Sequence, residues 1–284
     1  MTIDKVAAHY THGTLMDAVL AKLAEAGIAL DGLTAQDLAP MDHLHGRGRE
    51  ATDEMIARLQ PQPGQHLIDI GCGVGGPARY LAATTGARVS GIDLTPEFIA
   101  VADELATMTG LSDRADFQVG DALNLPFDAA AFDAGYTQNV SMSVPDKARF
   151  FAEAARVLKP GARFVAGEVA QGPGGDVIYP VPWAMTAEIS QLTTPEETAA
   201  ILEDAGFRVE AIHDSTDQAM AYNQAARTRA KEQGAPILNP LVILRENALE
   251  RMRNSARNVA QGRAIPVEFV CIRSRLFGPG TRPF

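Results

Sequence analysis

The first 60 residues place apolar side chains three and four positions apart. Segments 14–27, TLMDAVLAKLAEAG, and 48–59, GREATDEMIARL, show this spacing, which predicts two amphipathic helices. Between them, 33–40, LTAQDLAP, predicts a short helical turn closed by Pro40, because proline interrupts helical hydrogen bonds. Together the three segments predict a helical cover that precedes the main fold.

From residue 66 the pattern changes to short apolar runs that alternate with helical ones. The alternation is typical of an α/β fold with a mostly parallel sheet and helices on both faces. Ligands of such sheets bind beyond the carboxyl ends of the strands, near the point where the strand order reverses. The strands are expected at 66–70, 87–93, 116–120, 131–136, 162–170, 207–213 and 267–272, and the helices at 76–85, 96–110, 146–158 and 195–205.

Residues 214–262 break this alternation, because they predict helices only. A long helical insertion late in an α/β fold favours a lid or a substrate wall over extra packing. We therefore expect a cover at 1–60, a core at 61–213, an insertion at 214–262 and a last strand with its tail at 263–284. Most arginines of the insertion are expected on solvated helix faces, although one or two could face an anionic substrate.

Composition and charge exclude several classes of partner. The chain has 284 residues, of which 46% are hydrophobic, and a formal net charge of -10. A nucleic acid or an anionic membrane surface would need a positive footprint instead. No run of about 18 apolar residues predicts a membrane span, and the N-terminus lacks the apolar core of a signal peptide. Cys72 and Cys271 form no CxxC pair, so we expect a cytoplasmic protein with both thiols packed.

The stretch HLIDIGCGVGGPARYLA (66–82) predicts a ligand-binding turn between a strand and a helix. Its glycines allow positive φ angles and a close approach of a ligand to the backbone. Such a turn suits a dinucleotide or S-adenosylmethionine. Three carboxylates decide between them: Asp69 before the glycines, Asp93 at the end of the next strand and Asp121 after the third. An amine, a ribose and an exocyclic adenine amine would occupy all three, whereas Asp69 would repel a pyrophosphate.

The motifs DIGCGVGG, GIDLTPEF, GDALNLPF, AFDAGYTQNVSM and EAARVLKPGARFV cover residues 64–170. Together they resemble the class I S-adenosylmethionine-dependent methyltransferases. The resemblance implies a Rossmann-like, seven-stranded sheet with an antiparallel last strand, and S-adenosylmethionine as the cofactor. It also implies a set of cofactor-binding residues at the matching positions: Asp69, Gly71, Cys72 and Gly73 around the methionine part, Asp93 and Leu94 at the ribose, Asp121 and Ala122 at the adenine, and Gln138 beside the cofactor.

The flanks VAAHYTHGTL, DLAPMDHLHGRGREATDEM and PVPWA resemble a narrower group. This group includes sarcosine/dimethylglycine N-methyltransferases and sugar O-methyltransferases. In it an aromatic residue near the terminus covers the methionine end, and Tyr10 is the matching residue. The resemblance implies a small-molecule acceptor, but it does not fix which one.

Two further residues are candidates for catalysis. Asn139, in the exit loop of the fourth strand, could orient the acceptor or only cap the strand. His45 could act as a base or orient a group, or be an ordinary surface histidine. His43 and His45 lack nearby metal ligands, so we expect no metal. Trp183 could line the acceptor pocket or anchor its loop, and Met16, Met142 and Met185 are an expected apolar lining.

The sequence thus predicts an enzyme that transfers a methyl group to the nitrogen, oxygen or carbon of a small molecule. The expected partner is that acceptor, with no nucleic acid or membrane, and a homo-oligomer stays open. Two alternatives remain: an enzyme of this fold that catalyses a non-methylating reaction such as cyclisation, and a non-catalytic S-adenosylmethionine-binding regulator.

Overall fold

The structure is a computed structural model that describes residues 14–244 and 247–275. One seven-stranded sheet forms its centre, in the order β3-β2-β1-β4-β5-β7-β6. Strands β1 to β5 run parallel to one another, whereas β7 runs antiparallel to both β5 and β6. The strands are β1 His66–Ile70, β2 Arg88–Asp93, β3 Ala115–Val119, β4 Phe132–Gln138, β5 Leu158–Gln171, β6 Phe207–Asp214 and β7 Ala264–Arg273. The predicted sheet and its antiparallel last strand are confirmed.

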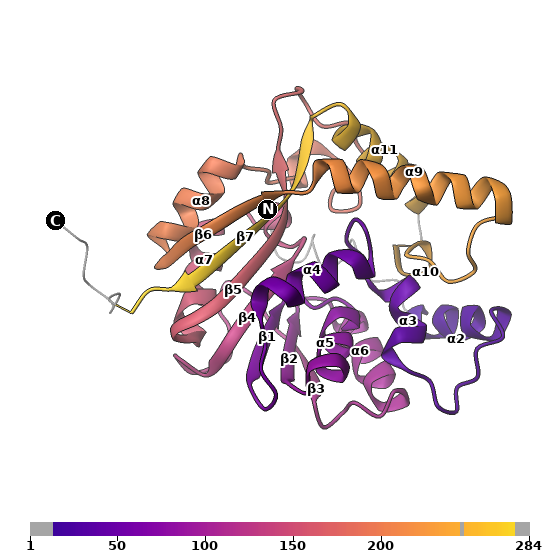
Figure 1. Ribbon diagram of the computed structural model, residues 1–284, viewed down its shortest axis with the longest axis horizontal. Helices are drawn as coiled ribbons and strands as arrows, with labels where there is room; N and C mark the ends of the chain where they lie inside the picture. The colour runs from indigo at the N-terminus through magenta and orange to yellow at the C-terminus, as the bar shows by residue number, and fades with distance from the viewer. Residues whose placement is uncertain (1–13, 245–246, 276–284) are drawn as a thin grey trace.

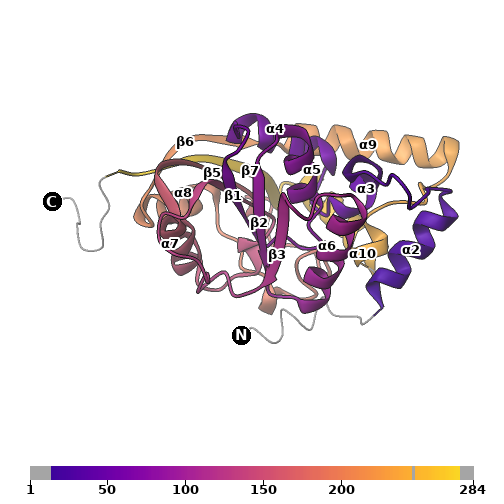
Figure 2. The same cartoon turned by 90° about the horizontal axis from the view of Figure 1, so that it is seen from below.

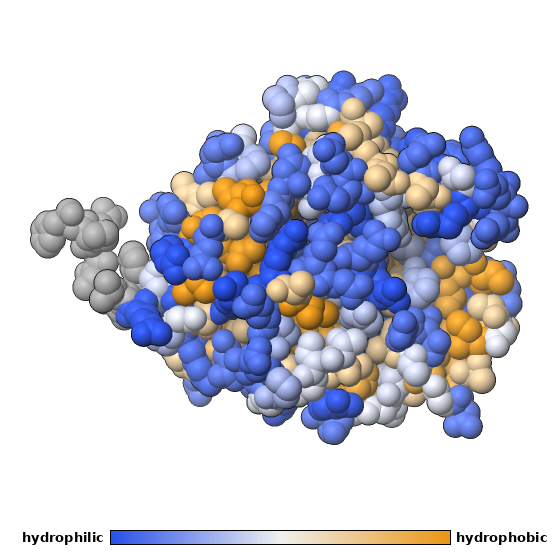
Figure 3. Space-filling model, in the orientation of Figure 1, coloured by the Kyte–Doolittle hydropathy of each residue, from blue (hydrophilic) through white to orange (hydrophobic). Residues whose placement is uncertain are grey.

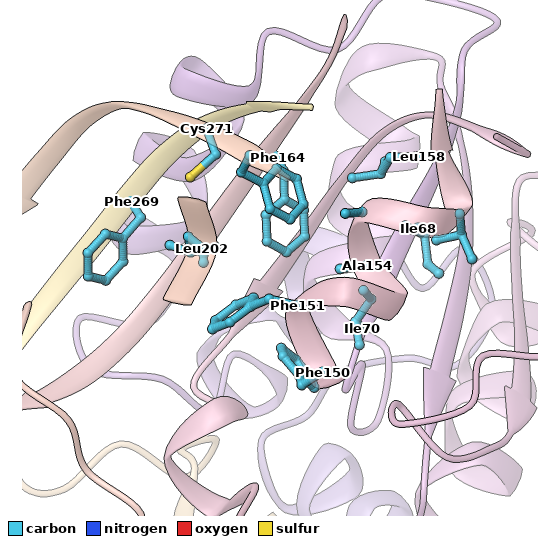
Figure 4. Close-up of a cluster of buried hydrophobic side chains, with 14 of the residues drawn as sticks. Ile68, Ile70, Phe150, Phe151, Ala154, Leu158, Phe164, Leu202, Phe269 and Cys271 are labelled. Atoms are coloured by element: carbon cyan, nitrogen blue, oxygen red, sulfur yellow. The ribbon is translucent and has the colours of Figure 1, made fainter. Parts of the chain in front are cut away.

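Helices cover both faces of this sheet (Figures 1 and 2). Apolar side chains of α4 and α5 pack on one face, and those of α7 and α8 pack on the other. Figure 4 shows the second layer, where Phe150 and Phe151 of α7 and Leu202 of α8 lie near Phe164 and Phe269 of the sheet. The core helices are α4 Arg49–Leu59, α5 Gly76–Thr85, α6 Pro96–Met108, α7 Lys147–Val157 and α8 Pro195–Asp204.

The N-terminal helices and the late insertion lie together at one end of the molecule (Figure 1). Leu15, Val19 and Leu23 of α2 pack with α3, α6 and Val242 and Ile243 of α10 in one buried cluster. Helices α9 and α11 contact each other and β7. The helices of this end are α2 Leu15–Glu25, α3 Ala35–Asp42, α9 Thr216–Gln233, α10 Leu241–Leu244 and α11 Ala248–Ala260.

Two expectations about individual elements need correction. Pro40 does not close its helix, because α3 continues to Asp42 with Pro40 inside it. As the sixth residue of α3, Pro40 removes one intrahelical hydrogen bond, to the Gln36 carbonyl, and the helix ends two residues later. The fifth strand is longer than 162–170, because its backbone pairing begins at Leu158, before Gly161.

On the face that Figure 3 shows, hydrophilic side chains predominate and hydrophobic ones gather in separate patches. Within the residues that the structure covers, no helix is both long and apolar enough to cross a membrane.

Candidate active site

The glycine turn after β1 lies where the strand order reverses, between β1 and β4. Gly71 adopts a φ of 81° and Gly73 a φ of 54°, which side chains rarely tolerate. A β-carbon at Gly71 would lie 2.3 Å from the Val140 side chain, so only glycine fits the turn against the exit of β4. The turn leads directly into α5 at Gly76. Because its glycines have no side chains, a ligand can approach the backbone of the turn closely.

Asp93 holds this turn from the end of β2. Its Oδ2 accepts from the Gly73 amide at 2.9 Å, and its Oδ1 accepts from the Thr95 amide at 2.9 Å. Each carboxylate oxygen keeps a second acceptor direction, as ribose hydroxyls would need. Burial raises the pKa of Asp93, and these two amides oppose that rise.

Asp69 lies buried beneath the turn, next to the last residue of β1. The Tyr136 hydroxyl donates to its Oδ2 at 3.0 Å. Burial raises the pKa of Asp69 to about 7, with a smaller contribution from the negative charge of Asp93, while the Tyr136 bond opposes the rise. A cationic ligand group would return this carboxyl to its charged form.

Two further strand ends complete the rim. Asp121 follows β3, where its Oδ1 accepts from the Leu123 amide at 2.8 Å and fixes the loop. Gln138 ends β4, and its Oε1 is buried with no hydrogen-bonding partner among the described residues. Asn139 follows with a left-handed φ of 59°, and its amide donates to the Gly167 carbonyl at 2.7 Å. A hydrogen-bond donor on a bound ligand would satisfy the buried Gln138 Oε1.

One cavity of about 530 Å³ brings the predicted site residues together. Its volume is in the range of small-molecule sites. Tyr10 lies outside the described residues. The predicted residues that line the cavity are His45, Asp69, Gly71, Cys72, Gly73, Asp93, Leu94, Asp121, Ala122, Gln138 and Asn139.

His45 reaches the cavity from the loop between α3 and α4. It is only 9% exposed, and its Nε2 lies 3.1 Å from the Thr52 hydroxyl. Burial lowers the pKa of His45 to about 3, with the neighbouring His43 charge adding to this effect. A neutral imidazole with so low a pKa is a weak base, which favours an orienting role for His45 over proton abstraction.

A buried ion pair fastens the end of α3 to the glycine turn. Arg79 Nη2 donates to Asp42 Oδ2 at 2.8 Å, and both side chains are almost fully buried. Arg79 Nη1 also donates to the Val74 carbonyl within the turn at 2.7 Å. The Asp42 carboxyl packs so closely on Gly76 that a β-carbon there would lie 2.6 Å from Asp42 Cγ. The cover and the cofactor turn therefore share one polar junction.

The late insertion forms the far wall of the same cavity. The lining includes Ala219 and Asn223 of α9 and Met252 and Val259 of α11. Arg251, from the arginine-rich segment, is 3% exposed and donates to the carbonyls of Val181, Pro182 and Leu244, so it anchors a loop. Among the described lining residues, Arg47 is the only arginine or lysine.

Trp183 and Met142 line the apolar side of the cavity. The indole Nε1 of Trp183 also donates to the Ser190 hydroxyl at 3.0 Å, so this residue both lines the cavity and anchors its loop. Met16 packs instead beside the buried cluster of α2, α6 and α10. Met185 is not among the described residues that line the cavity.

Sequence reasoning missed several ionisable residues of the cavity, namely Asp42, Arg47, Asp146, Glu168 and Glu268. Of these, Glu168 of β5 is 5% exposed. The motif ARFVAGEVA predicts a buried strand, and a glutamate inside such an apolar run is the signal that could have indicated Glu168. In the described part of the chain, no group of three or more histidine, cysteine or acidic residues is arranged to hold a metal ion.

A sheet of this order with a glycine turn at its switch point, and three carboxylates around one cavity, is typical of nucleoside-binding α/β proteins. The family model described as a methyltransferase domain matches residues 68–166. The chain is 32% identical over 185 residues to the methyltransferase GfsG of Streptomyces halstedii, covering 64% of this chain and 66% of GfsG. Residues 68–166 therefore match a methyltransferase domain, and the chain is similar to small-molecule methyltransferases over that part and its flanks. The predicted cofactor, S-adenosylmethionine, agrees with such a domain.

Two other similarities extend the comparison. The chain is 46% identical over 99 residues to a probable chloroplastic tocopherol O-methyltransferase of Oryza sativa subsp. japonica, covering 35% of this chain and 27% of that protein. The chain thus spans less than two thirds of the length of these curated relatives. The solved structure of the 4+2 cyclase SpnF covers 92% of this chain and 94% of its own, with 23% identity and a TM-score of 0.63, which shows a shared fold.

Proposed function

We propose that this protein transfers a methyl group from S-adenosylmethionine to a small-molecule acceptor. One observation carries the proposal: a single cavity joins the carboxylate-lined glycine turn to an apolar compartment under the helical insertion. A protein that only binds the cofactor would not need that second compartment. The expected boundaries of cover, core and insertion stay predictions.

The chain's own groups match the three parts of the cofactor. Asp69 would receive its ammonium, Asp93 its two ribose hydroxyls, and Asp121 the adenine amine. The free Gln138 Oε1 supports the fit, because it is a buried acceptor that awaits a donor. When bound, S-adenosylmethionine supplies an activated methyl group beside the end of β4.

The apolar compartment would hold the acceptor. Met142, Trp183, Leu244, Val259 and Val267 line it from five separate segments. Holding an acceptor in line at near-attack distance can contribute up to about 7–11 kcal/mol to the rate. Asn139 and His45, both at this cavity, would orient the acceptor, and Tyr10 stays a predicted cover of the methionine end. The two free, buried cysteines support a location in the cytoplasm.

A panel of alcohols, phenols and amines with methyl-labelled S-adenosylmethionine tests the proposal. We expect at least one product whose mass rises by one labelled methyl, together with stoichiometric S-adenosylhomocysteine. The proposal fails if the enzyme binds the cofactor but methylates no member of the panel.

A second candidate function is a cyclisation without methyl transfer. The observation that favours this second function is the shared fold with a 4+2 cyclase over nearly the full chain. A rearranged product of unchanged mass would identify this reaction in the same assay.

A further inference from the structure

Glu168 is a buried glutamate among the residues that line the cavity. It is 5% exposed, and neither carboxylate oxygen makes a hydrogen bond of normal geometry with any described residue. The Ser141 hydroxyl and the amides of Ser141 and Met142 lie close enough to lower its pKa. Leaving a buried polar group unpaired costs free energy, and native proteins rarely do so without a ligand or functional reason.

The neighbours of Glu168 keep it basic without neutralising it. Lys147, at the start of α7, directs its amine to the carbonyl and hydroxyl of Ser141 rather than to Glu168. Burial raises the pKa of Glu168, and the nearby Lys147 charge opposes the rise, with smaller effects from Ser141. The carboxylate is therefore a stronger base than a solvent-exposed glutamate.

Along the strand direction, Glu168 lies level with the carboxyl end of β4. Gln138 of β4 pairs with Gly167, so Glu168 is level with the exit of β4 at Asn139. Strand β1, which carries the glycine turn, is the next neighbour of β4. Two strand spacings of about 4.8 Å separate β5 from β1, which leaves roughly 10 Å for a methyl donor and an acceptor between them.

The charges of the cavity limit the acceptor. Among the described lining residues, the acidic ones greatly exceed the single Arg47, whose guanidinium is paired with Glu54. The lining acids are Asp42, Asp69, Asp93, Asp121, Asp146, Glu168 and Glu268. Asp42 pairs with Arg79 and Glu268 with Arg58, whereas the other five acids form no ion pair with a described residue. These five acids disfavour an anionic acceptor, and the Trp183 and Met142 side favours an apolar one.

We propose that Glu168 is a catalytic residue that binds the hydroxyl group of an apolar alcohol or phenol and accepts its proton. The inference rests on the proposed methyl transfer. The proton of the broken O–H bond passes to the Glu168 carboxylate, and the electron pair of that bond forms the new oxygen–carbon bond. The pair of the broken carbon–sulfur bond stays on sulfur, so the products are a methyl ether, S-adenosylhomocysteine and neutral Glu168.

A binding experiment tests the recognition step with naphthol, its methyl ether and naphthoate as probes. Each is titrated calorimetrically into the enzyme saturated with S-adenosylhomocysteine. We expect naphthol to bind about tenfold more tightly than either analogue, because a hydrogen bond to a charged acceptor contributes about 1.5–3 kcal/mol. Glu168→Leu should abolish the preference over the ether while S-adenosylhomocysteine affinity stays unchanged. Equal binding of naphthol and its ether to the wild type, or a preference that survives in Glu168→Leu, overturns the proposal.

Glu268→Gln is the matched control, because Glu268 is also a buried cavity carboxyl but Arg58 Nη1 donates to its Oε1 at 2.6 Å. It should keep the preference for naphthol. Glu168→Gln keeps a hydrogen-bond acceptor but cannot take a proton, so methyl transfer to a hydroxyl should fall about 100-fold with binding retained. Unchanged transfer in Glu168→Gln contradicts the base role. If the binding preference holds but the wild type methylates no member of the acceptor panel, the proposed function fails instead.

Discussion

The three aspartates of this site differ in how deeply they are buried and in what holds them. Asp93 and Asp121 are held by backbone amides at strand ends, whereas Asp69 lies in the interior with a single Tyr136 hydrogen bond. All three stand near strand ends in recognisable motifs, because Asp69 is the penultimate residue of β1, Asp93 is the last residue of β2 and Asp121 follows β3. Glu168 lies inside the long strand β5 and has no such motif, so only the packed structure shows that it lines the cavity.

Asp69 predicts a pH dependence of cofactor affinity. Since burial raises its pKa to about 7, the free protein holds a growing fraction of the carboxylate as pH rises through that value. The cofactor ammonium needs that carboxylate, so affinity for S-adenosylhomocysteine should rise severalfold from about pH 6 to about pH 7.5. Calorimetry across this range measures it. Asp69→Asn should bind more weakly with a flat profile, and an unchanged slope in this variant would remove Asp69 from the account.

At the scale of elements, most predicted helices and strands agree with the structure within a few residues, because their apolar periods were long and bounded by glycine or proline. The differences occur where tertiary contacts decide. Helix α3 runs past Pro40 so that Asp42 can reach Arg79. The chain after β5 is held by Arg251, which donates to loop carbonyls some 70 residues earlier in the chain. The sequence of a single segment does not indicate such long-range hydrogen bonds and ion pairs.

The junction of α3 with the cofactor turn predicts a coupled loss of stability and binding. Arg79→Met leaves the Asp42 charge buried with His43 as its one ion-pair partner among the described residues, so the free energy of unfolding should fall by about 3 kcal/mol. Affinity for S-adenosylhomocysteine should fall too, because Arg79 also holds the Val74 carbonyl. Denaturant titration and calorimetry measure the two effects.

Arg88→Met is the control, because the Arg88–Asp116 pair is about half exposed. Its loss should cost less than about 1 kcal/mol and leave cofactor affinity unchanged. Adding Asp42→Asn to Arg79→Met should recover part of the lost stability, since it removes the unpaired charge. Equal losses in the Arg79 and Arg88 variants would show that the junction has no special role.

At the scale of the whole molecule, the two halves of the site differ in how far the sequence predicts them. The cofactor half is built from consecutive strand ends and carries compact motifs. The acceptor half is assembled from the loop around His45, the exit of β4, β5, the Trp183 loop, and helices α9 and α11, which come together only on folding. The resemblance therefore fixes the cofactor, while the acceptor depends on the packing of the cover and the insertion.

The most direct test of the central claim is calorimetric titration of S-adenosylhomocysteine into the wild type and into Asp93→Ala. The account predicts one site per chain in the wild type, and a loss of affinity of about tenfold or more in the variant, because both ribose hydroxyls lose a buried charged acceptor. NAD should not bind either protein. Equal affinity of the two proteins for S-adenosylhomocysteine, or tight binding of NAD in its place, would contradict the account.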